Sequence, residues 1–408
     1  MSARFRTVGL AGRARDWTAL SADLKVHVGG PCGSVAVPPQ ARDVLRVGST
    51  VFAIERALSG SPGRNRPVEF EVELRLERPD LWTAGALAAL GALLEFQGDA
   101  RWTWSMSGGV QPGDGVDHTA LAAQDREVSR VVLFSGGLDS TSGISLDDGR
   151  AGETQLVSHY SRQKSVQRSL ASELGYEVPT QARISGTTGR GRGFLHRSFY
   201  FLCLAAFVAE TFGARSLVQY ENGILALAIP PSPAFMMTRH AHPRVHEAAR
   251  RLFAEVLGGT WSVENPFLKL TKRQCFDGRL AGLVKGTALL SEIESCWYTN
   301  SYQLLGGIEK TVGKPCGVCI PCLVRRTATR IAEGEIDPLA SATADLLKVG
   351  YHAYRTMTDQ ILAGGPKRAY LELPSYVRGL TAGAAPILMR EELEDLLERF
   401  AKEYDDSF

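Results

Sequence analysis

The chain has 408 residues, which is more than one average domain, so two domains are the starting expectation. Hydrophobic residues make up 44% of it and charged residues 22%, and the formal net charge of +2 argues against nucleic acid as the partner of the whole chain. No run of 18 or more apolar residues occurs, so we expect no membrane span. The basic N-terminus lacks the apolar core of a signal peptide, and an odd count of seven cysteines argues against a disulfide framework. A cytoplasmic location is therefore expected.

Residues 1–125 are predicted to form a small α+β domain. The stretch VEFEVELRLE (68–77) alternates apolar and charged residues, which predicts a half-buried strand. Its inward face would carry Val68, Phe70, Val72, Leu74 and Leu76. STVFAIERAL (49–58) and ARWTWSMS (100–107) are also predicted to be strands.

The same domain is expected to contain one helix and to end in a linker. PDLWTAGALAALGALLEF (79–96) is rich in Ala and Leu at helical spacing, and Asp80 is a candidate cap. The glycine-rich stretch GGVQPGDGVD (108–117) is typical of a linker. The domain holds no cluster of catalytic residue types, so we expect it to be an accessory.

Residues 126–335 are predicted to form an α/β domain with a doubly wound parallel sheet. Three buried strands are expected at RVVLFS (130–135), TQLVSHYS (154–161) and SLVQYEN (216–222). Helical stretches lie between them, at VQRSLASELG (166–175) and RSFYFLCLAAFVAETFG (197–213). Strands that alternate with helices indicate a parallel sheet, and ligands then bind at the carboxyl ends of its strands.

Residues 336–408 are predicted to be a helical segment. REELEDLLERFAKEYDDSF (390–408) is a charged amphipathic helix with leucines 393, 396 and 397 on one face. We expect this face to pack on the core or on a second copy of the chain, as in a homodimer.

The stretch VVLFSGGLDSTSG (131–143) carries the clearest chemical signal. Gly136 and Gly137 allow a sharp turn and a close approach of the backbone to a ligand, and their amides with those of the next helix form an anion-binding concavity. Hydroxyl donors are added by Ser135, Ser140 and Thr141. Asp139 would repel a phosphate, but it fits if it holds Mg²⁺ bridged to that phosphate. No lysine stands at the Walker A position, so this is not that loop.

Four cysteines form a second candidate site. Cys316, Cys319 and Cys322 follow a C-x2-C-x2-C spacing, and Cys296 precedes them by twenty residues. Four thiolates suit a closed tetrahedral Zn²⁺ site, although this spacing also suits an iron–sulfur cluster. The other three, Cys32, Cys203 and Cys275, are expected to be apolar fillers.

The motif SGGLDS after a strand resembles the PP-loop of the N-type ATP pyrophosphatases, which have the adenine-nucleotide alpha-hydrolase-like fold. The resemblance implies that the protein cleaves ATP between its α- and β-phosphates and adenylates an oxygen of its substrate. It also implies that the loop holds the departing pyrophosphate.

Together with the cysteines, this loop resembles the QueC family, the 7-cyano-7-deazaguanine synthases, over roughly residues 130–330. The similar stretches are SCWY (295–298), the segment from Cys316 to Arg325, YSRQKSVQ (160–167), Arg197-Ser198 and NPFLKLTKRQ (265–274). The resemblance implies that 7-carboxy-7-deazaguanine is adenylated and then captured by an amine. Arg197 or Lys272 would neutralise charge on the phosphates.

Two features differ from the biosynthetic members of that family. About 130 residues precede the loop, and YENGILALAIPPSPAFMMTRHAHPRVHE (220–247) replaces the family's substrate stretch. Glu221 and Asn222 follow a strand and could read a purine-like edge. A polar cluster that could hold a carboxylate or phosphate contains Thr238, Arg239, His240 and His242.

With these two features, the chain resembles the QueC-like branch found in bacterial anti-phage defence operons, of the QatC and type IV CBASS kind. The resemblance implies that the acceptor is the N-terminal amine of a partner protein, for which residues 1–125 would be a docking place. Three alternatives stay open: a biosynthetic nitrile synthase that uses ammonia, a tRNA thiolation enzyme, and a non-catalytic nucleotide-sensing scaffold. The near-neutral charge argues against tRNA, and the intact Asp139 argues against a scaffold.

Overall fold

The computed structural model describes most of the chain, and every structural statement below concerns the described residues. These are residues 3–8, 16–21, 24–31, 36–58, 68–98, 100–110, 114–118, 126–159, 164–187, 195–229, 238–284, 290, 293, 296, 309, 311, 314–331, 345–363, 381 and 386–408. The chain divides into two compact units. The first unit comprises Met1–Ser135, Asp147–Gln219 and Thr238–Asn265, and the second comprises Gly136–Leu146, Tyr220–Met237 and Pro266–Phe408.

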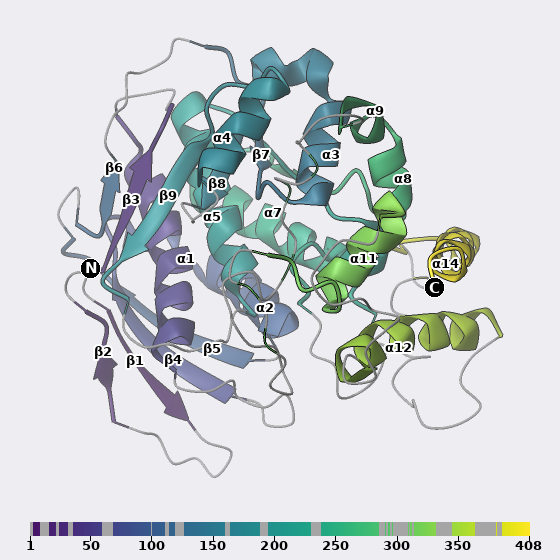
Figure 1. The fold of residues 1–408 in the computed structure, drawn as a ribbon. Coiled ribbons are helices and arrows are strands. Elements are labelled where there is room, and N and C mark those ends of the chain that lie inside the picture. The colour runs from purple at the N-terminus through teal and green to yellow at the C-terminus, as the bar shows by residue number, and fades with distance from the viewer. Residues whose placement is uncertain are drawn as a thin grey trace. The chain divides into compact units, whose positions relative to one another are not determined.

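The first unit contains a four-stranded sheet (Figure 1). Its strands, in spatial order, are β2 (Thr18–Ala19), β1 (Ala3–Val8), β4 (Val68–Arg75) and β5 (Ala100–Ser107). The alternation predicted for residues 68–77 is confirmed, because Phe70, Val72 and Leu74 are buried between more exposed glutamates. β5 is also a strand as predicted, and it pairs parallel to β4.

The helix predicted between these two strands is α2 (Ala84–Gly98). A parallel pair needs such a crossover, because the chain must return to the same end of the sheet. Its cap is Thr83, whose hydroxyl oxygen accepts a hydrogen bond from the Ala86 amide at 3.2 Å. The prediction of Asp80 as the cap is wrong, since Asp80 lies in the short 3-10 turn Pro79–Leu81.

Residues 49–58 were expected to be a strand, and this prediction is wrong. They belong to α1 (Pro39–Ala57), which begins with proline at its first position. Every residue from Asp43 to Glu55 is buried, and α1 packs against α5 (Arg197–Phe212), itself a helix as predicted. α1 is buried on nearly all of its faces although it carries charged residues such as Asp43 and Arg46, and a short buried apolar run within it cannot be told from a strand by periodicity alone.

The second sheet of this unit has seven strands and makes the protein a mixed α/β protein. In spatial order they are β11 (Ser262–Glu264), β10 (Ser216–Gln219), β7 (Arg130–Leu133), β8 (Thr154–His159), β9 (Thr180–Ser185), β3 (Lys25–Gly29) and β6 (Val116–His118). The first five are mutually parallel, as expected for a sheet built from strand–helix units. The chain proceeds from β7 to β8 and β9 and then returns to β10 on the other side of β7. The order of the strands therefore reverses beside β7.

Two strands of this sheet come from the segment expected to be a separate N-terminal domain. β3 pairs antiparallel with β9 and parallel with β6, and β6 overlaps the end of the stretch expected to be a linker. A boundary near residue 125 therefore does not separate the two sheets. Residues 1–125 were expected to be a docking place for a partner protein. A variant that lacks them would also lose two strands of the seven-stranded sheet, so it could not separate a loss of docking from a loss of folding.

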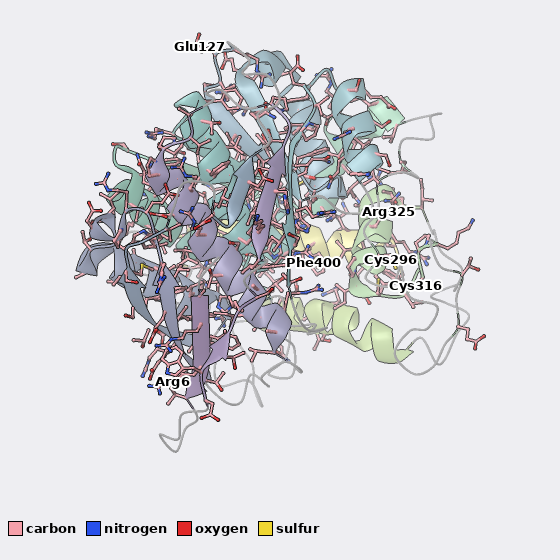
Figure 2. The ribbon with its side chains drawn as sticks, turned by 90° about the vertical axis from the view of Figure 1, so that its left-hand side faces the viewer. Arg6, Glu127, Cys296, Cys316, Arg325 and Phe400 are labelled. Carbon is pink, nitrogen blue, oxygen red and sulfur yellow. The ribbon has the colours of Figure 1, made fainter. Side chains whose placement is uncertain are left out.

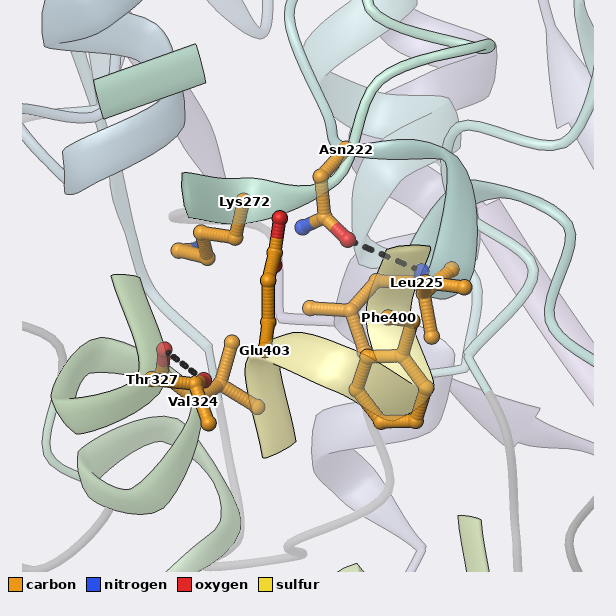
Figure 3. Close-up of a pocket in the computed structure, with 8 residues that line it drawn as sticks. Asn222, Leu225, Lys272, Val324, Thr327, Phe400 and Glu403 are labelled. Carbon is orange, nitrogen blue, oxygen red and sulfur yellow. Dashed lines mark hydrogen bonds between the residues drawn. The ribbon is translucent and has the colours of Figure 1, made fainter. Parts of the chain in front are cut away.

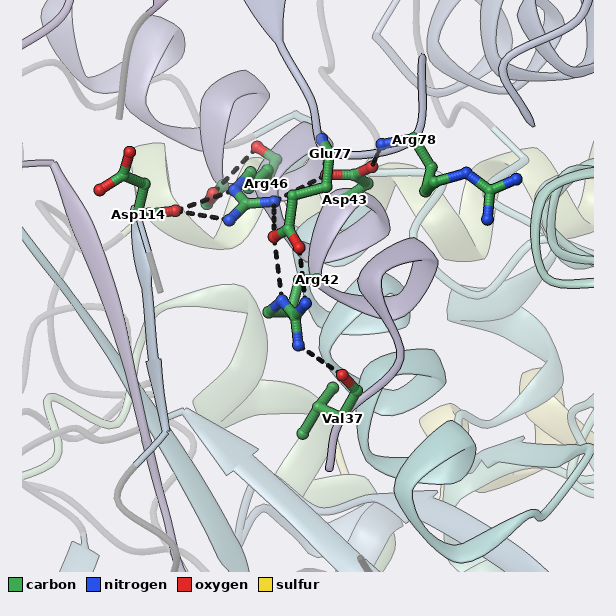
Figure 4. A network of polar contacts seen from close by, with 8 residues as sticks. Val37, Arg42, Asp43, Arg46, Glu77, Arg78 and Asp114 are labelled. Carbon is green, nitrogen blue, oxygen red and sulfur yellow. Dashed lines mark hydrogen bonds and ion pairs between the residues drawn. The ribbon is translucent and has the colours of Figure 1, made fainter. Parts of the chain in front are cut away.

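A buried network of ion pairs joins α1 to both sheets (Figure 4). The Arg46 guanidinium lies 2.7 Å from Asp43 and 2.5 Å from Glu77, which follows β4. It also donates two hydrogen bonds, of 2.9 and 2.7 Å, to the carbonyl of Asp114, just before β6. Arg42 completes the network through Glu77. Loss of one partner of such a buried group costs about 3–5 kcal/mol, so these contacts fix α1 against the segments that follow β4 and precede β6.

The remaining helices of the first unit cover its sheets and connect their strands. They are α4 (Lys164–Glu173), predicted from the sequence, and α7 (Pro243–Leu257). α5 packs on β7, β8 and β10, and α7 packs on α2 and β11.

The second unit is helical. Its helices are α3 (Leu138–Leu146), α6 (Gly223–Ala226), α8 (Lys272–Asp277), α9 (Leu280–Val284), α11 (Ile320–Thr329), α12 (Asp345–Leu362) and α14 (Arg390–Asp405). A second apolar core joins α6, α11, α12 and α14. Leu393, Leu396 and Leu397 are buried in it, which confirms the predicted apolar face of the last helix. No described helix is both long enough and apolar enough to cross a membrane.

Candidate active site and metal centre

The glycine-rich loop joins β7 to α3. Gly136 has a φ of 76°, in the left-handed region that favours glycine. The carbonyl of Gly137 accepts hydrogen bonds from the Thr141 amide at 3.0 Å and the Ser140 hydroxyl at 3.1 Å. The carbonyl of Ser135 accepts a hydrogen bond of 3.0 Å from Gln167 in the first unit. The sharp turn predicted after this strand is therefore present, and α3 begins directly behind it.

Asp139, on the first turn of α3, lies at the centre of a polar cluster in the second unit. The Lys272 ammonium is 2.5 Å from its Oδ2 atom, and the Asn222 amide donates to the same atom at 3.3 Å. The Asn222 amide also donates to Glu221 at 2.9 Å. The structure thus brings together four residues that the sequence singled out in three separate stretches.

Local hydrogen bonds fix the two partners of Asp139. Thr271 caps α8 with a capping box. Its hydroxyl oxygen accepts a hydrogen bond from the Gln274 amide, and the Gln274 side-chain oxygen accepts one from the Thr271 amide. Lys272 is therefore the first residue of that helix. Asn222 caps α6, and a side chain on Gly223 would lie only 2.1 Å from the Leu268 carbonyl.

The electrostatics of the cluster follow from its burial. Asp139 is only 6% exposed, and burial raises its pKa to about 7, against the opposing attraction of Lys272. Burial lowers the pKa of Lys272, but the carboxylates of Asp139 and Glu221 outweigh burial and leave that pKa above its usual value. Lys272 is therefore charged at neutral pH, and its ammonium opposes the effect of burial on Asp139.

One carboxylate oxygen of the buried Asp139 has no hydrogen-bond donor among the described residues. Asp139 Oδ1 has no hydrogen-bond partner among the described residues, and neither does the hydroxyl of the fully buried Thr141. An unsatisfied buried carboxylate oxygen is costly unless a ligand or ion completes it. Oxygen is the donor that Mg²⁺ prefers, so Asp139 fits the metal role predicted for it.

A cavity in the second unit adjoins this cluster (Figure 3). Asn222 and Lys272 line one side of it, and the rest of its wall comes from α6, α11 and α14. The wall residues that the sequence reasoning missed are Ile224, Leu225, Val324, Thr327, Phe400 and Glu403. No sequence signal marks them, because their patterns are those of ordinary core-facing helices.

The four cysteines of the predicted metal site come together in the second unit. Their sulfur atoms all lie within 4.8 Å of one another. The Cys319–Cys322 distance is 3.4 Å, and the Cys316–Cys322 and Cys296–Cys319 distances are both 3.9 Å. A tetrahedron with Zn–S bonds of about 2.3 Å has edges of about 3.8 Å. The four sulfurs therefore could hold a metal ion such as zinc.

Backbone contacts shape this site. The amides of Val318 and Cys319 donate to the Cys316 sulfur at 3.5 and 3.3 Å, and the turn that allows this has Gly317 at a φ of 82°. Arg325, on α11, donates to the carbonyls of Leu290 and Ile293, just upstream of Cys296. Figure 2 shows Arg325 beside Cys296 and Cys316. One arginine therefore ties the segment that carries the distant cysteine to the helix that follows the other three.

Arg197 lies in the first unit as the first residue of α5. Its guanidinium is 5.3 Å from the centre of the Phe201 ring, and the residue as a whole is exposed. His159, at the carboxyl end of β8, packs edge-on against Tyr200. Burial, followed by the charge of Arg197, lowers the pKa of His159 to about 4, so this ring is neutral at physiological pH. The role of Arg197 as a phosphate-neutralising cation stays a prediction.

The polar cluster predicted at residues 238–242 also lies in the first unit. Arg239 donates to the Phe96 carbonyl at 2.6 Å and lies over the Phe96 ring. His240 Nδ1 is 3.0 Å from the Thr238 hydroxyl. His242 caps α7, because its Nδ1 atom accepts a hydrogen bond from the Arg244 amide. These packing and capping contacts account for Arg239 and His242 at these positions, and a role in ligand binding stays a prediction.

The buried His246 gives this unit a testable pH dependence. Burial, and next the charge of His240, lowers the pKa of His246 from 6.5 to about 4. A lowered pKa stabilises the fold above pH 6.5, and this stabilisation is lost as the pH falls toward 4. We expect His246 alone to remove about 2 kcal/mol between pH 7 and pH 5. The free energy of unfolding, measured with urea at several pH values, should therefore change less with pH in His246→Gln than in the wild type. An equal change with pH in the two proteins would contradict the prediction.

Some of the predicted residues lie outside the described part of the chain. They are Cys32, residues 160–163, Ser295, Trp297 and Tyr298. Cys203 and Cys275 are buried, as expected of apolar fillers.

The fold and the site together define a mixed α/β protein with a parallel-rich seven-stranded sheet, a buried Asp–Lys–Asn cluster and a candidate four-cysteine metal centre. Comparison with known proteins finds no family model and no curated protein that matches the chain.

Proposed function

We propose that the protein is an ATP-dependent ligase that adenylates a carboxylate and passes the acyl group to an amine. The observation that carries this proposal is the Oδ1 atom of the buried Asp139, which has no partner among the described residues and lies on the first turn of the helix that follows the glycine-rich turn. A buried carboxylate would oppose phosphate binding by itself. It favours phosphate only as the holder of a divalent cation, which is the role of the aspartate in a PP-loop.

In the reaction, an oxygen of the substrate carboxylate attacks the α-phosphorus of ATP, and pyrophosphate leaves. The loop residues that would hold the phosphates are Ser135, Gly136, Gly137, Ser140 and Thr141, through amides and hydroxyls. Lys272 is charged and lies against Asp139, so it supplies a fixed positive charge for the developing negative charge. A magnesium ion held by Asp139 would neutralise part of the charge on the departing phosphates.

The substrate that we propose is 7-carboxy-7-deazaguanine. Glu221, half-buried beside Asn222, offers carboxylate oxygens that accept hydrogen bonds from the N–H groups of a guanine-like edge. Zinc in the four-cysteine site would have a structural role, because four thiolates leave no open coordination position for chemistry. The proposed acceptor is the N-terminal amine of a partner protein in bacterial anti-phage defence.

The experiment that tests this function is ATP–pyrophosphate exchange. The protein is incubated with ATP, Mg²⁺, labelled pyrophosphate and 7-carboxy-7-deazaguanine, and label that enters ATP reports reversible adenylation. Exchange that depends on the carboxylate supports the proposal. No exchange with this substrate, but exchange with another carboxylate, would overturn the substrate and keep the reaction.

A second measurement identifies the acceptor. Mass spectrometry after the same reaction with ammonia, or with a candidate partner protein, separates the two forms of the proposal. A deazaguanine-sized mass gain on the partner supports the conjugating ligase. A free amide or nitrile, with the partner unmodified, would mean that the protein is the biosynthetic synthase.

A further inference from the structure

The cavity beside the Asp139 cluster contains a carboxylate that the proposed adenylation does not use. Glu403, on α14, is only 9% exposed, and its Oε1 atom accepts a hydrogen bond from the Thr271 hydroxyl. No described residue donates to Oε2, and this atom is not sealed from solvent. Figure 3 shows the Glu403 carboxylate pointing toward the gap between Lys272 and Asn222. The cavity therefore holds an open hydrogen-bond acceptor beside the proposed reaction centre.

The rest of the cavity limits what can bind there. Its room suits a molecule of about the size of water, and four of its wall residues are apolar: Ile224, Leu225, Val324 and Phe400. A ligand that donates a hydrogen bond to Glu403 and is otherwise small satisfies both limits. An amine satisfies both limits, because its N–H groups donate to Glu403 and the group itself is small. Its neutral form is also the nucleophile that amide formation requires.

We propose that this cavity binds the amino group of the acceptor, with Glu403 as its hydrogen-bond acceptor. The inference rests on the proposed function, since it gives that reaction its second substrate site. It also gives α14 a role, because this helix supplies Glu403 and Phe400 to the cavity wall.

The step at this site is amide formation. The amine nitrogen attacks the carbonyl carbon of the acyl adenylate and forms the C–N bond. The bond from that carbon to the AMP oxygen breaks, and AMP leaves with the electron pair. The proton lost by the nitrogen passes to Glu403, so atoms and charge balance.

The test compares transfer with activation in one preparation. Hydroxylamine is the probe, because it is small and neutral at pH 7, and the product is the hydroxamate. In Glu403→Gln, which keeps an oxygen for Thr271, we expect the ratio of hydroxamate formation to pyrophosphate exchange to fall at least tenfold. The matched control is Glu398→Gln, an exposed glutamate on the same helix, which should keep the wild-type ratio.

The outcomes separate the two proposals. Exchange in the wild type with an unchanged ratio in Glu403→Gln would overturn the amine site, and so would an equal fall of exchange and transfer. If Glu403→Gln does not fold by circular dichroism, Val324→Leu replaces it. This variant narrows the cavity without changing its charge, and it should raise the KM for hydroxylamine several-fold.

A binding measurement covers the case in which the wild type shows no exchange, which would count against the proposed function alone. Hydroxylamine at pH 7 should raise the thermal midpoint of the wild type above that in sodium chloride of equal ionic strength. It should not do so in Glu403→Gln. Equal shifts in both proteins would overturn the site.

Discussion

Asp139→Asn should lower ATP–pyrophosphate exchange at least about a hundredfold, the largest effect that we expect of any single substitution. The amide keeps the shape of the carboxylate but not its charge. It therefore cannot hold a divalent cation as the carboxylate does, and it leaves the Lys272 ammonium buried without its nearest counter-charge. The readout is the exchange rate at saturating ATP, with Mg²⁺ varied.

The matched control is Asp277→Asn. Asp277 ends α8, the helix that begins with Lys272, and it makes an exposed ion pair with Arg330. Exposed pairs contribute about 0–1 kcal/mol, so this variant should keep both its stability and its exchange rate. If Asp139→Asn retains more than a tenth of the exchange while it folds normally, the metal-holding role of Asp139 is wrong.

The second large effect concerns the four cysteines. The purified protein is expected to contain one zinc ion per chain, and Cys319→Ala should lose it. The cluster joins Cys296 to the turn that starts α11, and α11 contributes to both the second apolar core and the cavity wall. Structural zinc sites contribute on the order of 10 kcal/mol in small domains, so loss of the ion should lower the thermal midpoint markedly. Metal analysis and thermal unfolding check both results.

Cys275→Ala is the control for this prediction. Cys275 is buried, but it does not belong to the cluster, so its removal should leave the zinc content unchanged. Iron with inorganic sulfide, or a visible absorption band that disappears in Cys319→Ala, would replace zinc with an iron–sulfur cluster. No metal in a protein purified without chelators would contradict a metal site of either kind.

The sequence alone was sufficient where a pattern is decided by residues close in the chain. Strand β4 follows from the strict alternation of apolar and charged residues, and the turn at Gly136 follows from two glycines after an apolar strand. The turn at Cys316–Cys319, in which the Cys319 amide donates to the Cys316 sulfur, follows from the cysteine spacing and from Gly317. In each case neighbours within a few residues determine the backbone conformation. The capping box at Thr271 was not predicted, although it also depends only on residues close in the chain, and it places Lys272 at a helix start.

Distant contacts decided the rest. The apolar run at residues 49–58 is helical because it lies against α5, and β6 is a strand because β3 lies beside it. Glu403 accepts a hydrogen bond from Thr271, which lies 132 residues earlier in the chain, and no local sequence pattern predicts this contact.

The sequence by itself determined which residue types stand at the turns at Gly136 and Cys316–Cys319 and in the core-facing stripes. Only the tertiary structure decided that Asp139 meets Lys272 and Asn222, and that the last helix contributes to the cavity wall. The physical reason is that short-range backbone preferences depend on adjacent residues. Burial, pKa and pairing depend instead on which distant segments exclude water from one another.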